Sequence, residues 1–276
     1  MLAELALSVA LAGWKAAIEA QSNTPVHIAV ADYDQPSHTY RLASGVPRRD
    51  LFASYLKSEH FTRQFQQMYA VMVHHKAPGD NAFLILLNGM RRNEWGGHEE
   101  AVIAHELGHA WIKAQGLPTP VFLDNAWACL SVHAGDIPQH VLIRAELDRR
   151  GIDHRTFWLL GLDTAAGQME ANPPPPESDR CARVRVAAQW ADIRLGLPEG
   201  AWPGRARYEA AVRKQMPEVE ETVDEIASYL QGRNLEDRNV HRAALKFVFQ
   251  KLKDLAEQRT KAYRVYATLK ETPHVT

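Results

Sequence analysis

Two histidines four residues apart, His105 and His109, constrain the fold of the chain more than any other feature of its sequence. They enclose Glu106 in the pattern His-Glu-Leu-Gly-His. All other residues of the segment Val102–Trp111 are uncharged and mostly apolar. In a helix with 3.6 residues per turn, positions four apart lie on one face. The spacing therefore predicts a helix over residues 98–115 that presents both imidazoles to one site.

This pattern has the residue types of a catalytic metal site. Two imidazoles on one helix face can bind one zinc ion at about 2.0–2.1 Å. A carboxylate directly after the first ligand is turned toward the same site and can take a proton from a zinc-bound water, whose pKa the ion lowers toward about 7. We therefore expect one zinc ion per chain, with His105 and His109 as ligands and Glu106 as general base.

The ten residues Val102–Trp111 resemble the signature of the zincin superfamily of zinc metallopeptidases, which carry an H-E-x-x-H helix. The resemblance implies an α+β, zincin-like fold with a small, mostly antiparallel sheet. It also implies hydrolysis of a peptide bond in a peptide or protein substrate that pairs with the sheet edge. Metzincins are excluded, because their longer motif requires Gly and His where this chain has Ile112 and Gln115. Peptide deformylases are excluded, because their cysteine ligand precedes the motif, whereas Cys129 and Cys181 of this chain both follow it.

The third zinc ligand is left open by the sequence. The candidates are the acidic and imidazole side chains downstream of the motif, namely His133, Asp136, His140, Glu146 and Glu170. His140 is favoured, because it begins a predicted helix over residues 138–150 and could point back to the motif. Glu146 comes next, because a glutamate on a later helix completes the site in gluzincin-like proteins. His140 and Glu146 are six residues apart and leave a helix on different faces, so they are not expected to bind together.

The remaining secondary structure follows from hydrophobic periodicity and from Gly and Pro positions. Residues 68–74 and 82–87 are two apolar runs joined by a turn sequence, which predicts a β-hairpin. The other expected elements are helices over 2–20, 50–67, 120–133 and 138–150, strands over 26–31 and 38–42, and a loop over 93–97.

The C-terminal part of the chain differs from the rest in its proline run and in its charged segments with helical periodicity. The run Pro173–Pro176 excludes a helix or a central strand and indicates a linker or surface loop. Beyond it, apolar residues follow steps of three and four in two series, from Val219 to Leu230 and from Leu245 to Leu269. The first series lies in an acidic segment and the second in a basic one. This predicts a helical hairpin with facing opposite charges, or a surface that docks an acidic protein partner or nucleic acid, and the apolar series could also pair with a second copy of the chain.

These patterns predict three regions: a zincin-like domain over 1–170, a Pro-rich linker with a connecting helix over 171–204, and a C-terminal helical hairpin over 205–276. The net charge of −1 gives no general attraction to nucleic acid, and no uninterrupted apolar run of membrane-spanning length occurs. The two cysteines are too few for a disulfide framework and fit a reducing, cytoplasmic compartment.

The function expected from the sequence is that of a cytoplasmic zinc metallopeptidase. The alternative is a zincin-shaped regulatory or binding protein, with a structural metal and C-terminal helices that dock a partner. The number of protein ligands separates the two, because a catalytic zinc keeps one coordination position for water whereas a structural zinc has four protein ligands.

Overall fold

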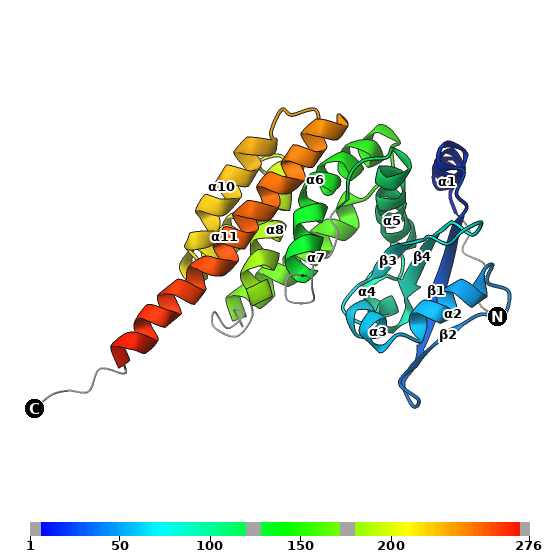
Figure 1. Cartoon of the computed structure of the whole chain (residues 1–276), viewed down its shortest axis with the longest axis horizontal. Coiled ribbons are helices and arrows are strands. Elements are labelled where there is room, and N and C mark those ends of the chain that lie inside the picture. The colour runs from blue at the N-terminus through cyan, green and yellow to red at the C-terminus, as the bar shows by residue number, and fades with distance from the viewer. Residues whose placement is uncertain (1–6, 120–127, 172–179, 271–276) are drawn as a thin grey trace, which may run out of the picture. The chain divides into compact units, whose positions relative to one another are not determined.

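The computed structural model describes residues 7–119, 128–171 and 180–270, and the strands of this part form one small sheet (Figure 1). The strands are β1 (Val26–Asp34), β2 (Thr39–Leu42), β3 (Ala70–His75) and β4 (Ala82–Asn88), in the order β2-β1-β4-β3. The β1–β2 and β3–β4 pairs are antiparallel and the β1–β4 pair is parallel. The hairpin predicted over residues 68–87 is confirmed, and so is the α+β class. The sheet itself is mixed.

Helices make up most of the described chain. In chain order they are α1 (Val9–Ser22), α2 (Arg49–Leu56), α3 (Glu59–Phe65), the 3-10 turn η1 (Gly89–Arg91), α4 (Arg92–Trp95), α5 (Glu99–Ala114), α6 (Ala128–Arg149), α7 (Arg155–Ala171), α8 (Arg180–Gly196), α9 (Arg205–Gln215), α10 (Glu218–Leu230) and α11 (Arg238–Lys270). Within the part of the chain that the structure describes, none of these helices has both the length and the apolar composition needed to cross a membrane.

The strand β4 is at the centre of the sheet and is covered on both faces. All seven of its residues are buried, as its continuous apolar sequence requires. On one face, Leu84 and Leu86 belong to a core cluster with Phe52 of α2 and Phe65 of α3. On the other face α5 contacts β3 and β4, and α1 contacts α5 and β1. The helix with the two histidines is therefore held against the sheet through the side chains of β3 and β4.

Two local predictions near the sheet are wrong. The helix expected over residues 50–67 is divided into α2 and α3, because the side chain of Ser58 accepts a hydrogen bond from the backbone N–H of Phe61 and caps a new helix. The loop expected over residues 93–97 begins as the helix α4, which is held by a hydrogen bond from Trp95 Nε1 to the carbonyl oxygen of Asn88 at 2.8 Å.

The helix α6 replaces the two helices expected over 120–133 and 138–150, and residues 120–127 lie outside the described part. The sequence predicts that the first helix ends at residue 133 and that the second begins at Pro138. The structure instead places Pro138 inside one helix, between the buried residues Ile137 and Gln139. A proline removes a single N–H donor, and burial of the residues around it stabilises the helix on both sides.

The C-terminal helices confirm the predicted hairpin. Val219, Val223, Ile226 and Leu230 of α10 are all buried, and α10 packs against α11. Lys251 of α11 forms an ion pair with Glu225 of α10 at 2.7 Å, in agreement with the opposite charges of the two segments. The hairpin is not isolated, because α10 and α11 also contact α8. The second apolar series is followed as far as Leu255, since side chains beyond residue 257 lie outside the described part.

Contacts divide the chain into two compact units. The first comprises Met1–Gly116 with Ile143–Trp158, and the second comprises Leu117–Leu142 with Leu159–Thr276. This division differs from the three regions expected from the sequence, because the chain leaves the first unit after α5 and returns to it along α6. The run Pro173–Pro176 lies outside the described residues.

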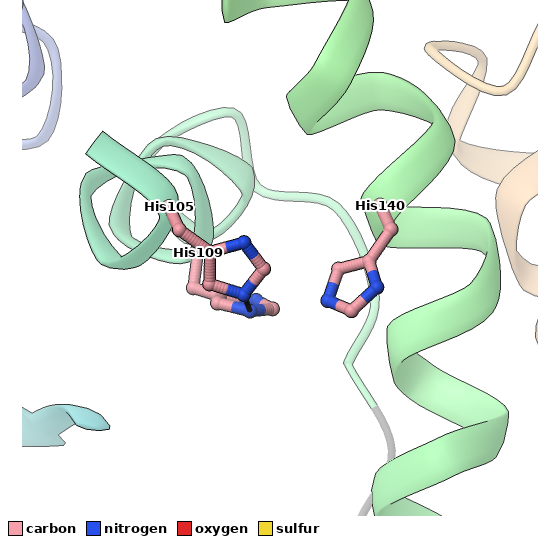
Figure 2. Close-up of side chains that lie close together, drawn as sticks. All are labelled: His105, His109 and His140. Carbon is pink, nitrogen blue, oxygen red and sulfur yellow. Dashed lines mark hydrogen bonds between the residues drawn. The ribbon is translucent and has the colours of Figure 1, made fainter. Parts of the chain in front are cut away.

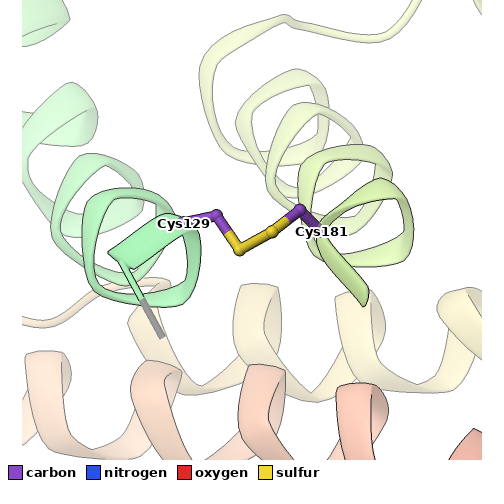
Figure 3. Close-up of a disulfide and its surroundings, with 2 residues drawn as sticks. All are labelled: Cys129 and Cys181. Atoms are coloured by element: carbon purple, nitrogen blue, oxygen red, sulfur yellow. A yellow bond between two sulfur atoms is a disulfide. The ribbon is translucent and has the colours of Figure 1, made fainter. Parts of the chain in front are cut away.

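A disulfide joins Cys129 near the start of α6 to Cys181 near the start of α8, with the two Cα atoms 6.0 Å apart (Figure 3). Both cysteines belong to the second unit. The expectation that the cysteine count fits a reducing compartment is therefore corrected. Disulfides persist mainly in oxidising compartments, so the cysteines of this chain no longer favour a cytoplasmic location.

Candidate metal centre

The helix α5 forms where the sequence predicts it and carries the first two histidines. Glu99 and Glu100 lie in its first turn, where carboxylates interact favourably with the helix dipole. His105 and His109 are half-buried on one face, and their Nε2 atoms are 3.3 Å apart. The local sequence therefore suffices to bring these two imidazoles together.

The helix α6, which carries the third histidine, approaches α5 closely at Gly108. Gly108 of α5 has no side chain, and a Cβ atom there would lie 2.5 Å from Cγ2 of Ile143 on α6. Both residues belong to the first unit. His140 precedes Ile143 by about one turn of the same helix. The point at which α6 packs on Gly108 is thus about one helical turn from His140.

His105, His109 and His140 form what we call the histidine cluster. Figure 2 shows the three rings turned toward one another, two from α5 and one from α6. Each ring offers one nitrogen atom, and these atoms all lie within 4.8 Å of one another. Among the described residues, this is the single group of three or more His, Cys, Asp or Glu side chains that meets this geometry.

The donor set fits a zinc ion. Two nitrogen ligands at 2.0–2.1 Å from one tetrahedral ion are about 3.3–3.4 Å apart. The Nε2 atoms of His105 and His109 are separated by 3.3 Å. Three neutral imidazoles are a ligand set that zinc accepts in catalytic sites, where the fourth position is taken by water or substrate.

The other side of His140 is held by a carboxylate on another helix. Nδ1 of His140 is 2.7 Å from Oδ2 of Asp192 on α8. The exposed fractions of these two side chains are 15% and 16%. A carboxylate accepts hydrogen bonds and does not donate them, so Nδ1 of His140 donates. The remaining nitrogen of the ring, Nε2, is then the one with a lone pair for a metal.

Glu106, the expected general base, is buried, with 8% of its surface exposed. It follows His105 directly on α5. A carboxylate directly after a metal-ligating histidine is placed to take part in proton transfer at the same site.

The other candidate ligands are engaged elsewhere. Glu146 accepts hydrogen bonds from the guanidinium groups of Arg149 and Arg150 at 2.6 Å, and these contacts lower its pKa in spite of its burial. Glu170 pairs with Arg207 at 3.1 Å. Neither belongs to the histidine cluster. The sequence ranks Glu146 second and also offers Arg149 and Arg150 as its neighbours, and the structure pairs its carboxylate with Arg149 at the end of α6 and with Arg150 directly after it.

His133 and Asp136 also lie outside the histidine cluster. They precede His140 on α6, and His133 Nδ1 is 4.0 Å from Asp136 Oδ2. Burial, reinforced by the charge of Arg185, lowers the pKa of His133 to about 4. Burial raises the pKa of Asp136 to about 6. Each residue is therefore shifted toward its neutral form.

Sequence reasoning missed Asp192. The spacing from the cysteines could have pointed to Asp192, because it follows Cys181 by the same number of residues as His140 follows Cys129. That signal is readable only when the two cysteines are known to be joined.

A comparison with known proteins adds no relative, since no family model, no curated protein and no solved structure matches the chain.

Proposed function

We propose that the protein is a zinc-dependent metallohydrolase, and that it is a peptidase of the zincin type. The observation that carries this proposal is the histidine cluster, three convergent imidazoles beside a buried glutamate. The resemblance of Val102–Trp111 to the zincin signature supports the reaction class. The proposed ligands are His105, His109 and His140, with one zinc ion per chain.

The chain's own residues have separate tasks in this proposal. When bound, zinc supplies Lewis-acid polarisation of a carbonyl and acidifies water. Glu106 takes the proton of the attacking water on its carboxylate and later gives it to the leaving amine. Asp192 keeps Nδ1 of His140 protonated, so that Nε2 faces the cluster.

The test combines metal content with peptide hydrolysis. We expect one zinc per chain in the unaltered protein and none after His109→Ala or His140→Ala. Glu106→Gln should keep the zinc and reduce turnover of a quenched fluorescent peptide mixture about 10²–10⁴-fold, the range for loss of a general base. Glu99→Gln, in the first turn of the same helix, is the matched control and should change neither. Full activity in Glu106→Gln would refute the proposed mechanism.

The alternative function, a binding protein with a structural metal, requires a fourth protein ligand. The histidine cluster has three members among the described residues, which favours the catalytic alternative. Absorption spectroscopy of the cobalt-substituted protein distinguishes the two. A spectrum that responds to added small anions indicates an exchangeable position, whereas an unresponsive four-ligand spectrum would support the structural site.

A further inference from the structure

The helices α6 and α8 are joined at two points, and both points have the same spacing. The first is the disulfide between Cys129 and Cys181, and the second is the contact between His140 and Asp192. His140 lies eleven residues after Cys129, and Asp192 lies eleven residues after Cys181. Eleven residues are about three helical turns, so both contacts of each helix lie on the same face.

This equal spacing means that the two helices run in the same direction with no relative shift along their axes. At 1.5 Å per residue, each contact is about 16 Å from the other on both helices. A shift of either helix by one turn, about 5.4 Å, would break the contact between His140 and Asp192. A bond at the first point therefore restricts the geometry at the second.

Polar side chains lie between the two points. His133 and Asp136 are on this face of α6, and the charge of Arg185 on α8 acts on His133. Interlocking apolar side chains are what sets the register of most helix pairs. Polar side chains interlock less than apolar ones, so the covalent bond adds to what fixes the register here.

We propose that Asp192 is a positioning residue for His140, and that the Cys129–Cys181 disulfide holds α8 in the register that keeps Asp192 on Nδ1 of His140. The inference rests on the proposed zinc site. Outer carboxylates of this kind fix the ring orientation and tautomer of a histidine ligand, and their loss typically weakens metal binding about 10–100-fold.

The role of Asp192 is tested by zinc affinity, measured in competition with a chromogenic chelator. We expect Asp192→Ala to lose 10–100-fold in affinity. Asp192→Asn, which keeps the shape and an acceptor oxygen, should lose less. Asp163→Asn is the matched control, because Asp163 accepts a hydrogen bond from Trp202 Nε1 at 2.7 Å in the same unit. A zinc affinity of Asp192→Ala within twofold of the unaltered protein would overturn the inference.

A spectroscopic measurement separates positioning from a general structural effect. Nitrogen-15 NMR of the histidine rings reports which nitrogen carries the proton. In the metal-free protein we expect His140 to be protonated at Nδ1, and to lose this preference in Asp192→Ala while the other histidines keep their signals. An unchanged His140 tautomer in Asp192→Ala would contradict the positioning role, whatever the variant does to stability.

The disulfide is tested with a double-mutant cycle. The Cys129→Ser/Cys181→Ser variant should bind zinc more weakly than the unaltered protein. If the disulfide acts through Asp192, adding the serines to Asp192→Ala should cause little further loss, because the contact is already absent. Full additivity, or unchanged affinity in the serine variant, would overturn the part of the inference that concerns the disulfide.

The outcomes also distinguish this inference from the proposed function. One zinc per chain that depends on His140 but not on Asp192 would leave the zinc site standing and reject only the positioning role. Absence of zinc binding in the unaltered protein would reject both. The elemental analysis above therefore comes first, and the chelator competition follows with the same preparations.

Discussion

At the scale of single residues, Gly108 has a role that only its neighbour explains. The residue lies between the two histidines of α5 and opposite Ile143 of α6. We expect Gly108→Ala to lower the free energy of unfolding by about 1–3 kcal/mol, as overpacking does in a core. Because His140 is carried by α6, the variant should also weaken zinc binding.

Urea denaturation and chelator competition check both effects. Gly13→Ala is the control, since Gly13 is in α1 and a Cβ there would meet nothing within 4 Å. That substitution should raise stability slightly, by up to about 1 kcal/mol. Equal stability and zinc affinity in Gly108→Ala and the unaltered protein would show that α6 is not held at this point.

The second residue-scale prediction concerns pH. Burial raises the pKa of Asp136 from 3.8 to about 6, so between these values the folded protein holds a proton that the unfolded chain releases, and stability falls as pH rises. The pKa of His133 is lowered from 6.5 to about 4, so the unfolded chain binds the extra proton and stability rises with pH. The two effects oppose each other over nearly the same range.

Substitution of one residue should reveal the effect of the other. In metal-free Asp136→Asn, the free energy of unfolding should increase between pH 4 and about 6.5, whereas the unaltered protein should change less. His133→Gln should show the reverse slope up to about pH 6. Urea titrations at a series of pH values measure these slopes, and parallel curves for all three proteins would contradict the assigned pKa directions.

At the scale of elements, burial rather than charge holds the α10–α11 hairpin. Ile226 is fully buried in the apolar seam, whereas Glu225 and Lys251 pair at the surface. Ile226→Ala should cost about 2–5 kcal/mol of unfolding free energy. Glu225→Gln should cost less than about 1 kcal/mol, the range for exposed ion pairs. Thermal denaturation of the two variants provides the comparison, and a larger loss in Glu225→Gln would reverse this ranking.

The helix α6 shows where periodicity and breaker residues mislead. The sequence predicts a break between residues 133 and 138, with Pro138 as the first residue of a new helix, because proline is rarely found inside helices. In the structure the residues around it are buried, and their packing maintains the helix. The consequence for the site is large, since a continuous helix is what links His140 to Ile143 and hence to α5.

At the scale of the whole molecule, zinc binding should stabilise the fold. A ligand that binds only the folded state adds about 2.7 kcal/mol at one hundred times its dissociation constant. Zinc should therefore raise the melting temperature of the unaltered protein but not of His109→Ala. His60→Ala, a change of an exposed histidine outside the histidine cluster, is the control and should respond to zinc like the unaltered protein. Equal shifts in all three would indicate binding elsewhere.

Local sequence was sufficient for the elements whose partners are near in the chain. Alternating and continuous apolar residues predicted the β3–β4 hairpin, and the His-Glu-Leu-Gly-His spacing predicted that α5 would align two imidazoles. Helical seams predicted the α10–α11 pair. These predictions succeed because backbone geometry converts residue spacing directly into a common face.

Tertiary packing decided everything that joins distant segments. The sequence favoured His140 as third ligand without a means of placing it, and it identified neither Asp192 nor the disulfide. Each of these depends on which helices lie side by side, which periodicity within one helix does not encode. The contact of Gly108 with Ile143 holds α6 about one turn from His140, and the pairing of α6 with α8 puts Asp192 on Nδ1 of His140.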